Sequence, residues 1–420
     1  MALDFPSSPN IGDTFPGPSS SWAWDGRAWN VVPMEAGGDA SVYAGDTPPA
    51  EPKPNELWFN TATGVLYIYY TDADSSQFVQ VSASPQMVDQ NYARKTARAR
   101  NIIRNPVMQI SQENGTNAVW TSGGYPADQW QVQFSGITAS AFKTQNMQTP
   151  ENTSNAISFS ASVAKPSLAA TDYLALAQPI EGQDLVPLQW PTVVGVPAIL
   201  VFSVYANKTG MFCYSICNAA ANRSFVGSFE ITAAYTPQKV VAVIPPEPKV
   251  TAAWPRDTSL GAYLRIATSV GSDFIGLAGW QDGNKMGLGG MSNGAIAPTQ
   301  LYVTDVGLYA DIDKTGVPPP FMTPAYDDDL RACMRYWEPL TFSSTMVATA
   351  ASQLLGAYVP FVVPKRQTPT IGNRVNTAGA ANATWNSWQQ LTQRGVASYS
   401  SSGAAGVVRQ EATAEANARM

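Results

Sequence analysis

The sequence of 420 residues contains no histidine, and this absence excludes several kinds of chemistry. Histidine is the side chain that titrates nearest neutral pH, and it is the commonest metal ligand in proteins. A Ser-His-Asp or Cys-His catalytic arrangement is therefore impossible within this chain, as is a zinc site built from cysteine and histidine. Carboxylate-pair chemistry of the glycosidase type stays open, because it needs only Asp and Glu.

Charged residues are scarce as well, at 13% of the chain against roughly 25% in an ordinary soluble domain. The net charge of −6 and the sequence pI of about 4.8 are unfavourable for binding nucleic acid. No apolar run is long enough to span a bilayer, and the N-terminus lacks the basic start and apolar run of a secretory signal. We therefore expect a soluble protein without nucleic-acid partners, membrane insertion or cofactors. If it acts outside the cell that makes it, it leaves by lysis.

The chain has only three cysteines, Cys213, Cys217 and Cys333. An odd and sparse set does not form a disulfide framework. Cys213 and Cys217 would lie on the same face of a strand, yet too far apart along it for an easy bond. We expect buried thiols that act as small hydrophobic side chains, consistent with assembly in a reducing cytoplasm.

Proline and glycine, at 32 residues each, are spread along the chain, so turns recur throughout it. This pattern predicts a mainly β protein with many short strands. We divide the chain into four segments. They are two small aromatic β-hairpin modules in residues 1–84, a linking helix in 85–104, a central antiparallel β-sandwich in 105–340 and a C-terminal β-module in 341–420.

The N-terminal segment contains a diverged internal repeat of aromatic strands joined by short turns. In its first copy, Asp25-Gly26 separates two aromatic strands, which is a strong signal for a two-residue hairpin turn. A proline-rich link, residues 46–54, separates the two copies and should be extended. The indoles of this segment could stack on sugars, but modules this small need large aromatic side chains as a core, which favours burial. These indoles belong to Trp22, Trp24, Trp29 and Trp58.

Residues 86–104 are predicted to form the linking helix. Val88, Tyr92 and Ile102-Ile103 place apolar side chains at helical spacing, and Asn105-Pro106 would end the helix. Its polar face is basic, and three explanations stay open: an anionic partner, an ordinary solvated face, or contact with copies of the chain around a three-fold axis. The basic residues are Arg94, Lys95, Arg98, Arg100 and Arg104.

The central segment carries several motifs in a fixed order. They are Tyr125 followed by Asp128-Gln-Trp130, then Gln178-x-Ile180-Glu181-Gly182, an apolar strand in 198–210, and Cys333-Met-Arg335-Tyr336-Trp337 on a short helix. Together these motifs resemble the carbohydrate-binding-like jelly-roll domain of tail-fibre and other virion proteins of tailed bacteriophages. The resemblance covers a little over half of the chain. It implies a jelly-roll sandwich in which the stretch from Asn101 to Gln112 and residues 301–309 contribute the opening and closing strands.

The resemblance also implies a function. The protein would be a virion component, and in the first instance a homotrimeric tail fibre. Its N-terminal region would attach to other virion proteins, and its distal β-domains would recognise a host surface polysaccharide or lipopolysaccharide without cleaving it. The alternatives are a structural head fibre, decoration or collar protein with no receptor role, and a glycan depolymerase. A fold of this kind hosts many functions, so it says little about the ligand by itself.

A sugar site needs an exposed aromatic plane with hydrogen-bonding groups beside it. Two stretches offer this mix: Trp280 with Asn284, and Trp385 with Trp388 near the C-terminus. The second stretch is favoured, because the tips of fibres face the receptor. All four residues are candidate ligand-binding residues.

We predict neither catalytic residues nor a metal site. Asp311 and Asp313 would share one face of a strand, and Asp327-Asp328-Asp329 forms a local acidic run. Either group could bind Ca²⁺ through its oxygen atoms. A solvated turn for the first group and a helix start for the second are the simpler explanations.

Overall fold

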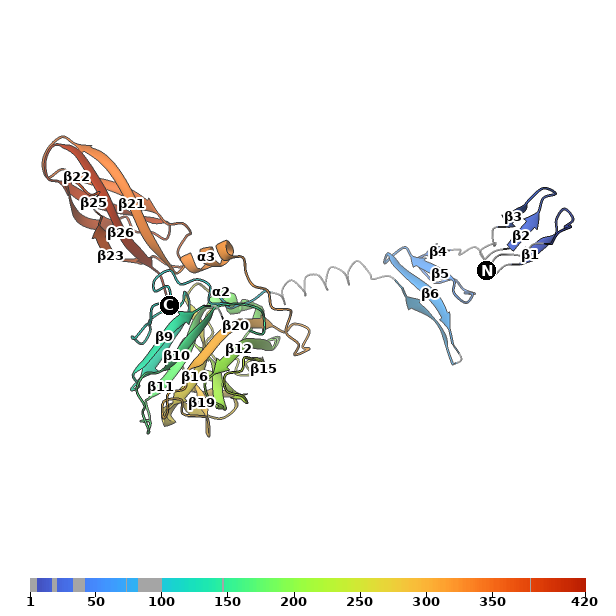
Figure 1. The fold of residues 1–420 in the computed structure, drawn as a ribbon, viewed down its shortest axis with the longest axis horizontal. Helices are drawn as coiled ribbons and strands as arrows, with labels where there is room; N and C mark the ends of the chain where they lie inside the picture. Colours follow the sequence, from blue (N-terminus) through green and yellow to red (C-terminus); the bar gives the residue numbers. More distant parts are fainter. Residues whose placement is uncertain are drawn as a thin grey trace. The chain divides into compact units, whose positions relative to one another are not determined.

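The computed structural model describes residues 6–16, 21–32, 42–72, 74–81, 100–145, 147–377 and 379–420. The chain forms two compact units, Met1–Ala93 and Arg94–Met420, which are described separately (Figure 1). Its regular structure is mainly β, as predicted, and almost all the strand pairs are antiparallel. No helix in the described ranges is long and apolar enough to cross a membrane.

The first unit begins with a three-stranded antiparallel sheet. Its strands are β1 (Thr14–Pro16), β2 (Ser21–Trp24) and β3 (Trp29–Val32). The predicted hairpin joins β2 to β3, and the Asp25 carboxylate accepts hydrogen bonds from the backbone N–H groups of Arg27 and Ala28, both at 2.8 Å. Gly26 has φ 95, a conformation that glycine adopts without strain. The hairpin is confirmed, but residues 25–28 form its loop instead of Asp25-Gly26 alone.

A second sheet in this unit has the strand order β4-β5-β6-β7. Its strands are β4 (Val42–Gly45), β5 (Leu57–Asn60), β6 (Val65–Thr71) and β7 (Ser76–Gln80). Trp58 is buried between Tyr67 and Phe78, with ring centroids 4.9 Å and 5.3 Å away, so it is a core residue. The proline-rich link lies between β4 and β5, which pair in parallel. It is therefore a connection inside this sheet and does not separate two modules.

The second unit contains a sandwich of two antiparallel sheets. The five-stranded sheet has the order β15 (Gln238–Ile244), β12 (Ala198–Ala206), β20 (Leu301–Ala310), β10 (Ala156–Ala161) and β9 (Ala139–Thr144). The six-stranded sheet has the order β18 (Gly279–Asp282), β14 (Arg223–Ile231), β13 (Gly210–Asn218), β16 (Leu260–Val270), β11 (Tyr173–Glu181) and β8 (Gln131–Ser135). Short elements complete it: α2 (Gly182–Leu185), η1 (Val186–Leu188), η2 (Ser272–Phe274), β17 (Ile275–Gly276) and β19 (Gly287–Leu288).

Alternation along the strands builds the sandwich core. On β12, Leu200, Phe202 and Val204 point into it, as a side-chain period of two requires. Phe202 meets Phe229 of the opposite sheet with ring centroids 5.1 Å apart. The three cysteines are buried and unbonded, which confirms that prediction, and burial raises the pKa of Cys213 to about 11.

The segment before the sandwich differs from its prediction. Residues 85–99 of the expected linking helix lie outside the described residues, and residues 100–112 are neither helix nor strand. Instead, the backbone N–H of Ile102 donates to the carbonyl of Leu308 at 2.9 Å, and the Asn101 side chain bonds the same strand. Ile102 and Ile103 are buried in the sandwich core. These two apolar side chains anchor the segment to the sandwich and do not form the stripe of a helix. The segment lies beside β20, but it is not the predicted opening strand.

The described part of the basic run has a partner within the chain. The guanidinium of Arg104 donates to both carboxylate oxygens of Asp184, at 2.8 Å and 2.9 Å, and Arg100 donates to the same carboxylate at 3.1 Å. Asp184 is buried, so it needs this compensation. These two arginines serve the fold, whereas Arg94, Lys95 and Arg98 lie outside the described residues.

A helix and a second β-module complete this unit. The predicted helix is α3 (Tyr326–Met334), and it carries Cys333 as expected. One sheet of the module has the order β21 (Trp337–Ala348), β26 (Gly406–Asn417) and β23 (Thr370–Asn376). The other has the order β22 (Leu354–Pro360), β25 (Gly395–Ser402) and β24 (Ala383–Gln389). The predicted boundary at residue 341 is wrong, because it falls inside β21. Figure 1 shows this module in orange and red, next to α3.

Buried charges tie the module to the sandwich. The guanidinium of Arg366 donates to the backbone carbonyls of Thr258 and Arg419, both at 2.9 Å. At the base of the module, Lys365 forms an ion pair with Glu338 at 3.0 Å, and both side chains are almost fully buried. These contacts join segments that are far apart in the sequence.

Candidate functional site

Trp280, the first predicted sugar-stacking residue, lies on β18 and belongs to an aromatic cluster. Its ring meets those of Trp190, Phe225 and Trp254 edge to face, with centroids 5.2 Å, 5.5 Å and 5.8 Å away. The indole N–H donates to the carbonyl of Pro245 at 2.9 Å. Edge-to-face contacts between aromatic rings are favourable, so the ring of Trp280 is used for packing within the protein. Trp280 is therefore the weaker of the predicted positions for a sugar.

Asn284 follows the turn after β18. Its side-chain oxygen accepts a hydrogen bond from the Arg265 guanidinium at 2.7 Å, and Arg265 in turn lies over the ring of Tyr263 at 4.9 Å. Asn284 thus orients an arginine on β16. No contact brings it together with Trp280, although only three residues separate them.

A hollow of about 350 Å³ beside this region is lined by Arg223, Lys249 and Asp282. Its charges are already paired with one another. The Arg223 guanidinium bonds the buried carboxylate of Glu247 at 2.7 Å, and Asp282 accepts from Lys249 at 2.8 Å. A ligand would have to compete with these ion pairs for the same groups.

The second predicted pair, Trp385 and Trp388, lies on β24 in the C-terminal module. A spacing of three places residues on opposite faces of a regular strand. Here a β-bulge changes the register: Trp385 pairs with Ser400, and Trp388 pairs with Ser398. Because residues 398 and 400 share one face of β25, both indoles share that face, and their centroids are 6.0 Å apart. The bulge residue is Asn386, whose side-chain oxygen accepts from the backbone N–H of Ser401 at 3.0 Å.

The two indoles have different surroundings. Trp388 packs against Phe342 of the opposite sheet, with centroids 5.8 Å apart, and is half-buried. Trp385 is 37% exposed. The guanidinium of Arg374, on β23 in the opposite sheet, lies 5.0 Å from its ring centroid. The structure therefore combines an exposed indole with a cation at this edge of the module.

Arg374 was not predicted as a site residue. One of its Nη atoms donates to the Asn376 side chain at 2.6 Å, and its Nε is a buried donor without a hydrogen-bond partner in the described part of the chain. Desolvation lowers its pKa. No local sequence signal links Arg374 to Trp385, because they meet only through the packing of two sheets.

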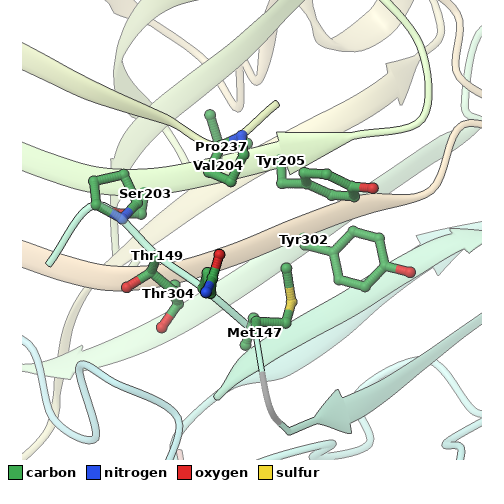
Figure 2. A pocket seen from close by; sticks show the side chains of 11 residues that line it. Met147, Thr149, Ser203, Val204, Tyr205, Pro237, Tyr302 and Thr304 are labelled. Carbon is green, nitrogen blue, oxygen red and sulfur yellow. The ribbon is translucent and has the colours of Figure 1, made fainter. Parts of the chain in front are cut away.

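A small cavity lies on the face of the five-stranded sheet that points away from the core (Figure 2). Tyr205 and Tyr302 stand at this cavity, with ring centroids 5.1 Å apart. The hydroxyls of Ser203 and Thr304 also line it, and neither has a hydrogen-bond partner among the described residues. Its volume is about 10 Å³, which is room for roughly one water molecule. It is too small for a sugar ring.

The acidic candidates act in local structure. β20 ends at Ala310, so Asp311 and Asp313 do not share a strand face, which corrects that prediction. The buried Asp311 carboxylate accepts from the backbone N–H groups of Thr315 and Gly316 at 3.1 Å and 2.7 Å. Asp329 is buried in α3 and accepts from the backbone N–H of Asn105 at 3.0 Å. Across the described ranges, no three His, Cys, Asp or Glu side chains gather in a way that could hold a metal ion.

No protein family and no curated protein matches this sequence. Solved structures match it in part. The enzymatically active domain of tailspike protein 4 from bacteriophage CBA120 is 11% identical over 50% of this chain and 21% of that one, with a TM-score of 0.28. The family 11 carbohydrate-binding module of a cellulosomal cellulase from Clostridium thermocellum is 9% identical over 46% of this chain and 95% of that one, with a TM-score of 0.25.

A third structure, TmCBM61 in complex with β-1,4-galactotriose, is 13% identical over 50% of this chain and 99% of that one, with a TM-score of 0.25. The similar structures thus include a phage tailspike domain and carbohydrate-binding modules. This chain spans only about a fifth of the tailspike chain. At these identities and TM-scores the likeness carries no argument about ligand or activity, which has to come from the residues themselves.

Proposed function

We propose that the protein is a virion fibre protein of a tailed bacteriophage that recognises a host surface glycan through its C-terminal module. The observation that carries the proposal is the edge at Trp385. There a β-bulge holds an exposed indole beside Trp388 and the guanidinium of Arg374. A sugar ring can stack on the indole, and its hydroxyls can accept hydrogen bonds from the arginine.

The outer face of the sheet that contains Trp385 supports the oligomeric part of the proposal. β22, β24 and β25 contain no charged residue, and Leu354 and Tyr358 are exposed on β22. A neutral face with exposed apolar side chains is suited to contact with another chain. In a homotrimer these faces would meet copies of themselves, and the N-terminal unit would attach the fibre to other virion proteins.

Binding of the labelled protein to a panel of bacterial polysaccharides and to host cells tests the glycan-binding proposal. We expect saturable binding that blocks phage adsorption, and a loss of about tenfold or more in affinity for Trp385→Ala. Trp385→Phe should keep most of the binding, because it retains an aromatic plane. Val375→Ala is the matched control, since Val375 is an exposed side chain on β23 next to Arg374.

Normal binding by Trp385→Ala would refute the proposed site. If a folded oligomer of the wild-type protein binds no polysaccharide and no cells, the receptor role fails. The alternative is then a structural head fibre, decoration or collar protein, which immunogold labelling of virions would locate. Release of reducing sugar from a bound polysaccharide would instead support a depolymerase.

A further inference from the structure

A second hollow lies where the segment before β8 meets the end of the chain's last strand, β26. Its volume is about 500 Å³, and it is open to solvent. Glu113, Asn114, Trp120 and Tyr125 line it from one side, and Arg419 lines it from the other. About three hundred residues separate the two sides, so only the folded chain forms this hollow.

Trp120 is the exposed aromatic side chain of the hollow. It is 59% exposed, more than Trp385, and so contributes little to the core. Its backbone is nevertheless fixed, because the adjacent Val119 is buried and exchanges hydrogen bonds with Ala141 at 2.7 Å and 3.0 Å. On the other side, the backbone N–H of Gly124 donates to the carbonyl of Thr121 at 3.0 Å. The indole is thus held on an anchored loop, which lowers the entropy cost of binding to it.

The polar groups of the hollow are also held in place. The Arg419 guanidinium lies between two rings, 3.9 Å from the centroid of Tyr125 and 5.2 Å from that of Trp337. Its Nη1 forms an ion pair with the carboxylate of Glu113. The Arg419 side chain is only 7% exposed, whereas that of Glu113 is 36% exposed. The buried arginine therefore positions a solvent-accessible carboxylate in the same hollow as Trp120.

We propose that this hollow is a second carbohydrate site, which binds a neutral sugar. The sugar ring stacks on the indole of Trp120, and its hydroxyls donate hydrogen bonds to the Glu113 carboxylate. Hydrogen bonds to an ionised acceptor are stronger than those between neutral groups, and stacking removes apolar surface from water. The amide nitrogen of Asn114 donates to the carbonyl of Tyr125 at 2.9 Å, which directs its side chain along the same wall.

Charge decides the class of sugar. The accessible charged atoms of the hollow are the Glu113 oxygens, which repel a carboxylate or sulfate. Nε and Nη2 of Arg419 have no partner in the described ranges, but both atoms are buried, so an anion cannot reach them without moving the rings. A neutral hexose or N-acetylhexosamine fits this arrangement better than an acidic sugar. The site is separate from the edge at Trp385, which lies on β24 of the C-terminal module.

The test uses the full chain carrying Trp385→Ala, so that the first site does not contribute. This protein is applied to an array of neutral oligosaccharides, including cellohexaose, maltohexaose, chitohexaose and β-1,4-galactotriose, with polygalacturonate as the acidic member. The strongest neutral binder is then titrated by calorimetry. We expect neutral binding that weakens about tenfold or more on adding Trp120→Ala, and that Trp120→Phe largely retains. Adding Glu113→Gln should weaken it severalfold, because the amide keeps one acceptor but loses the charge.

Tyr326→Ala is the matched control, since Tyr326 is an exposed aromatic residue on α3 outside the hollow. Thermal unfolding of each variant shows whether its fold is retained. The proposal is overturned if Trp120→Ala binds like its parent, if only polygalacturonate binds, or if no neutral oligosaccharide binds. Loss of binding by Trp385→Ala alone bears on the first site, so the two proposals fail in different experiments.

Discussion

The central sandwich and the C-terminal module both consist of two β-sheets, yet their interiors are different. In the sandwich, large side chains such as Phe159, Phe202 and Phe212 fill the space between the sheets, and each is at most 1% exposed. In the module, small side chains take the corresponding places, among them Ser398, Ser400 and Ala412. The apolar cluster of the module is small and includes Leu340, Val359, Phe361 and Val396.

Both regions bury hydroxyls without a hydrogen-bond partner among the described residues, including those of Ser203 and Thr304 in the sandwich. The hydroxyls of Ser344, Ser398 and Ser400 and the side-chain oxygen of Gln410 are buried without a partner among the described residues. Buried polar groups without partners cost free energy, and the module has only a small apolar cluster to offset that cost, so its interior stabilises it weakly. The sandwich has a large apolar core, whereas in the module Trp385 is 37% exposed and Trp388 is only half-buried.

Tryptophan illustrates what this difference means for function. Trp280 sits over the dense core and is held by Trp190, Trp254 and Phe225. Trp385 sits over small side chains, and no aromatic ring other than that of Trp388 lies against it in the described structure. The packing around the residue, and not the residue type, therefore determines which indole is available to a ligand.

Truncating a buried core side chain should give the largest difference in stability between the two regions. We expect Phe202→Ala to destabilise the protein by about 3–5 kcal/mol, because it removes a fully buried ring and leaves a cavity. Val396→Ala, in the cluster of the module, should cost about 2 kcal/mol, since it removes fewer buried carbon atoms. Denaturant unfolding followed by hydrogen exchange measures both effects and assigns each to its region.

The region in which protection from hydrogen exchange is lost is as informative as the size of the destabilisation. Val396→Ala should accelerate exchange in β21–β26 and leave β11–β16 protected. Equal loss of protection in both regions would show that the sandwich and module unfold as one cooperative unit. The hydrogen bond from Arg366 to the carbonyl of Thr258, which joins the module to the sandwich, would then be the first contact to examine.

Much of the fold follows from local sequence. The apolar run in residues 198–206 predicts β12, and the Asp25-Gly26 turn predicts the hairpin of β2 and β3. The helix predicted to extend to residue 104 is wrong at its end, because the apolar pair Ile102-Ile103 fits a helix as well as an anchor to the sandwich core. Only the distant strand β20, which bonds Asn101 and Ile102, decides between the two.

The candidate site was harder to predict for the same reason. Trp385 and Trp388 were found from their side chains, but their common face depends on a bulge that sequence spacing does not reveal. Arg374 and Arg419 reach their aromatic neighbours through contacts between distant segments. Trp120 was overlooked because a lone tryptophan gives no sign of whether it is buried.

The partnerless hydroxyls allow a finer test of the module. We expect Ser400→Ala to be neutral or to stabilise the protein by up to about 1 kcal/mol, because it removes a buried hydroxyl that forms no bond within the described structure. Asp311→Ala, which removes a buried carboxylate bonded to two backbone N–H groups, is the contrasting change in the sandwich and should cost more. Thermal unfolding compares them. A clear destabilisation by Ser400→Ala would mean that the hydroxyl is satisfied in solution.

The smallest expected effect is a pH dependence of the unfolding free energy that comes from the sandwich, because Asp128 is buried beside its core. Burial is the main influence on this carboxyl and raises its pKa above the ordinary value of 3.8, although Gln112 donates hydrogen bonds to it. The folded protein then keeps the proton at a pH where the unfolded chain has lost it. The contribution of Asp128 to stability is therefore fully present below pH 3.8 and is lost as the pH rises through the folded pKa.

The substitution Asp128→Asn removes this pH dependence. We would measure unfolding free energies from about pH 3.5 upward. The stability of the variant should first rise relative to that of the wild type, and the difference should then stay constant. A constant difference across the whole range would show that the surrounding hydrogen bonds offset the burial. The hydrogen bonds that Gln112 donates would then compensate fully for the burial of this carboxyl beside the sandwich core.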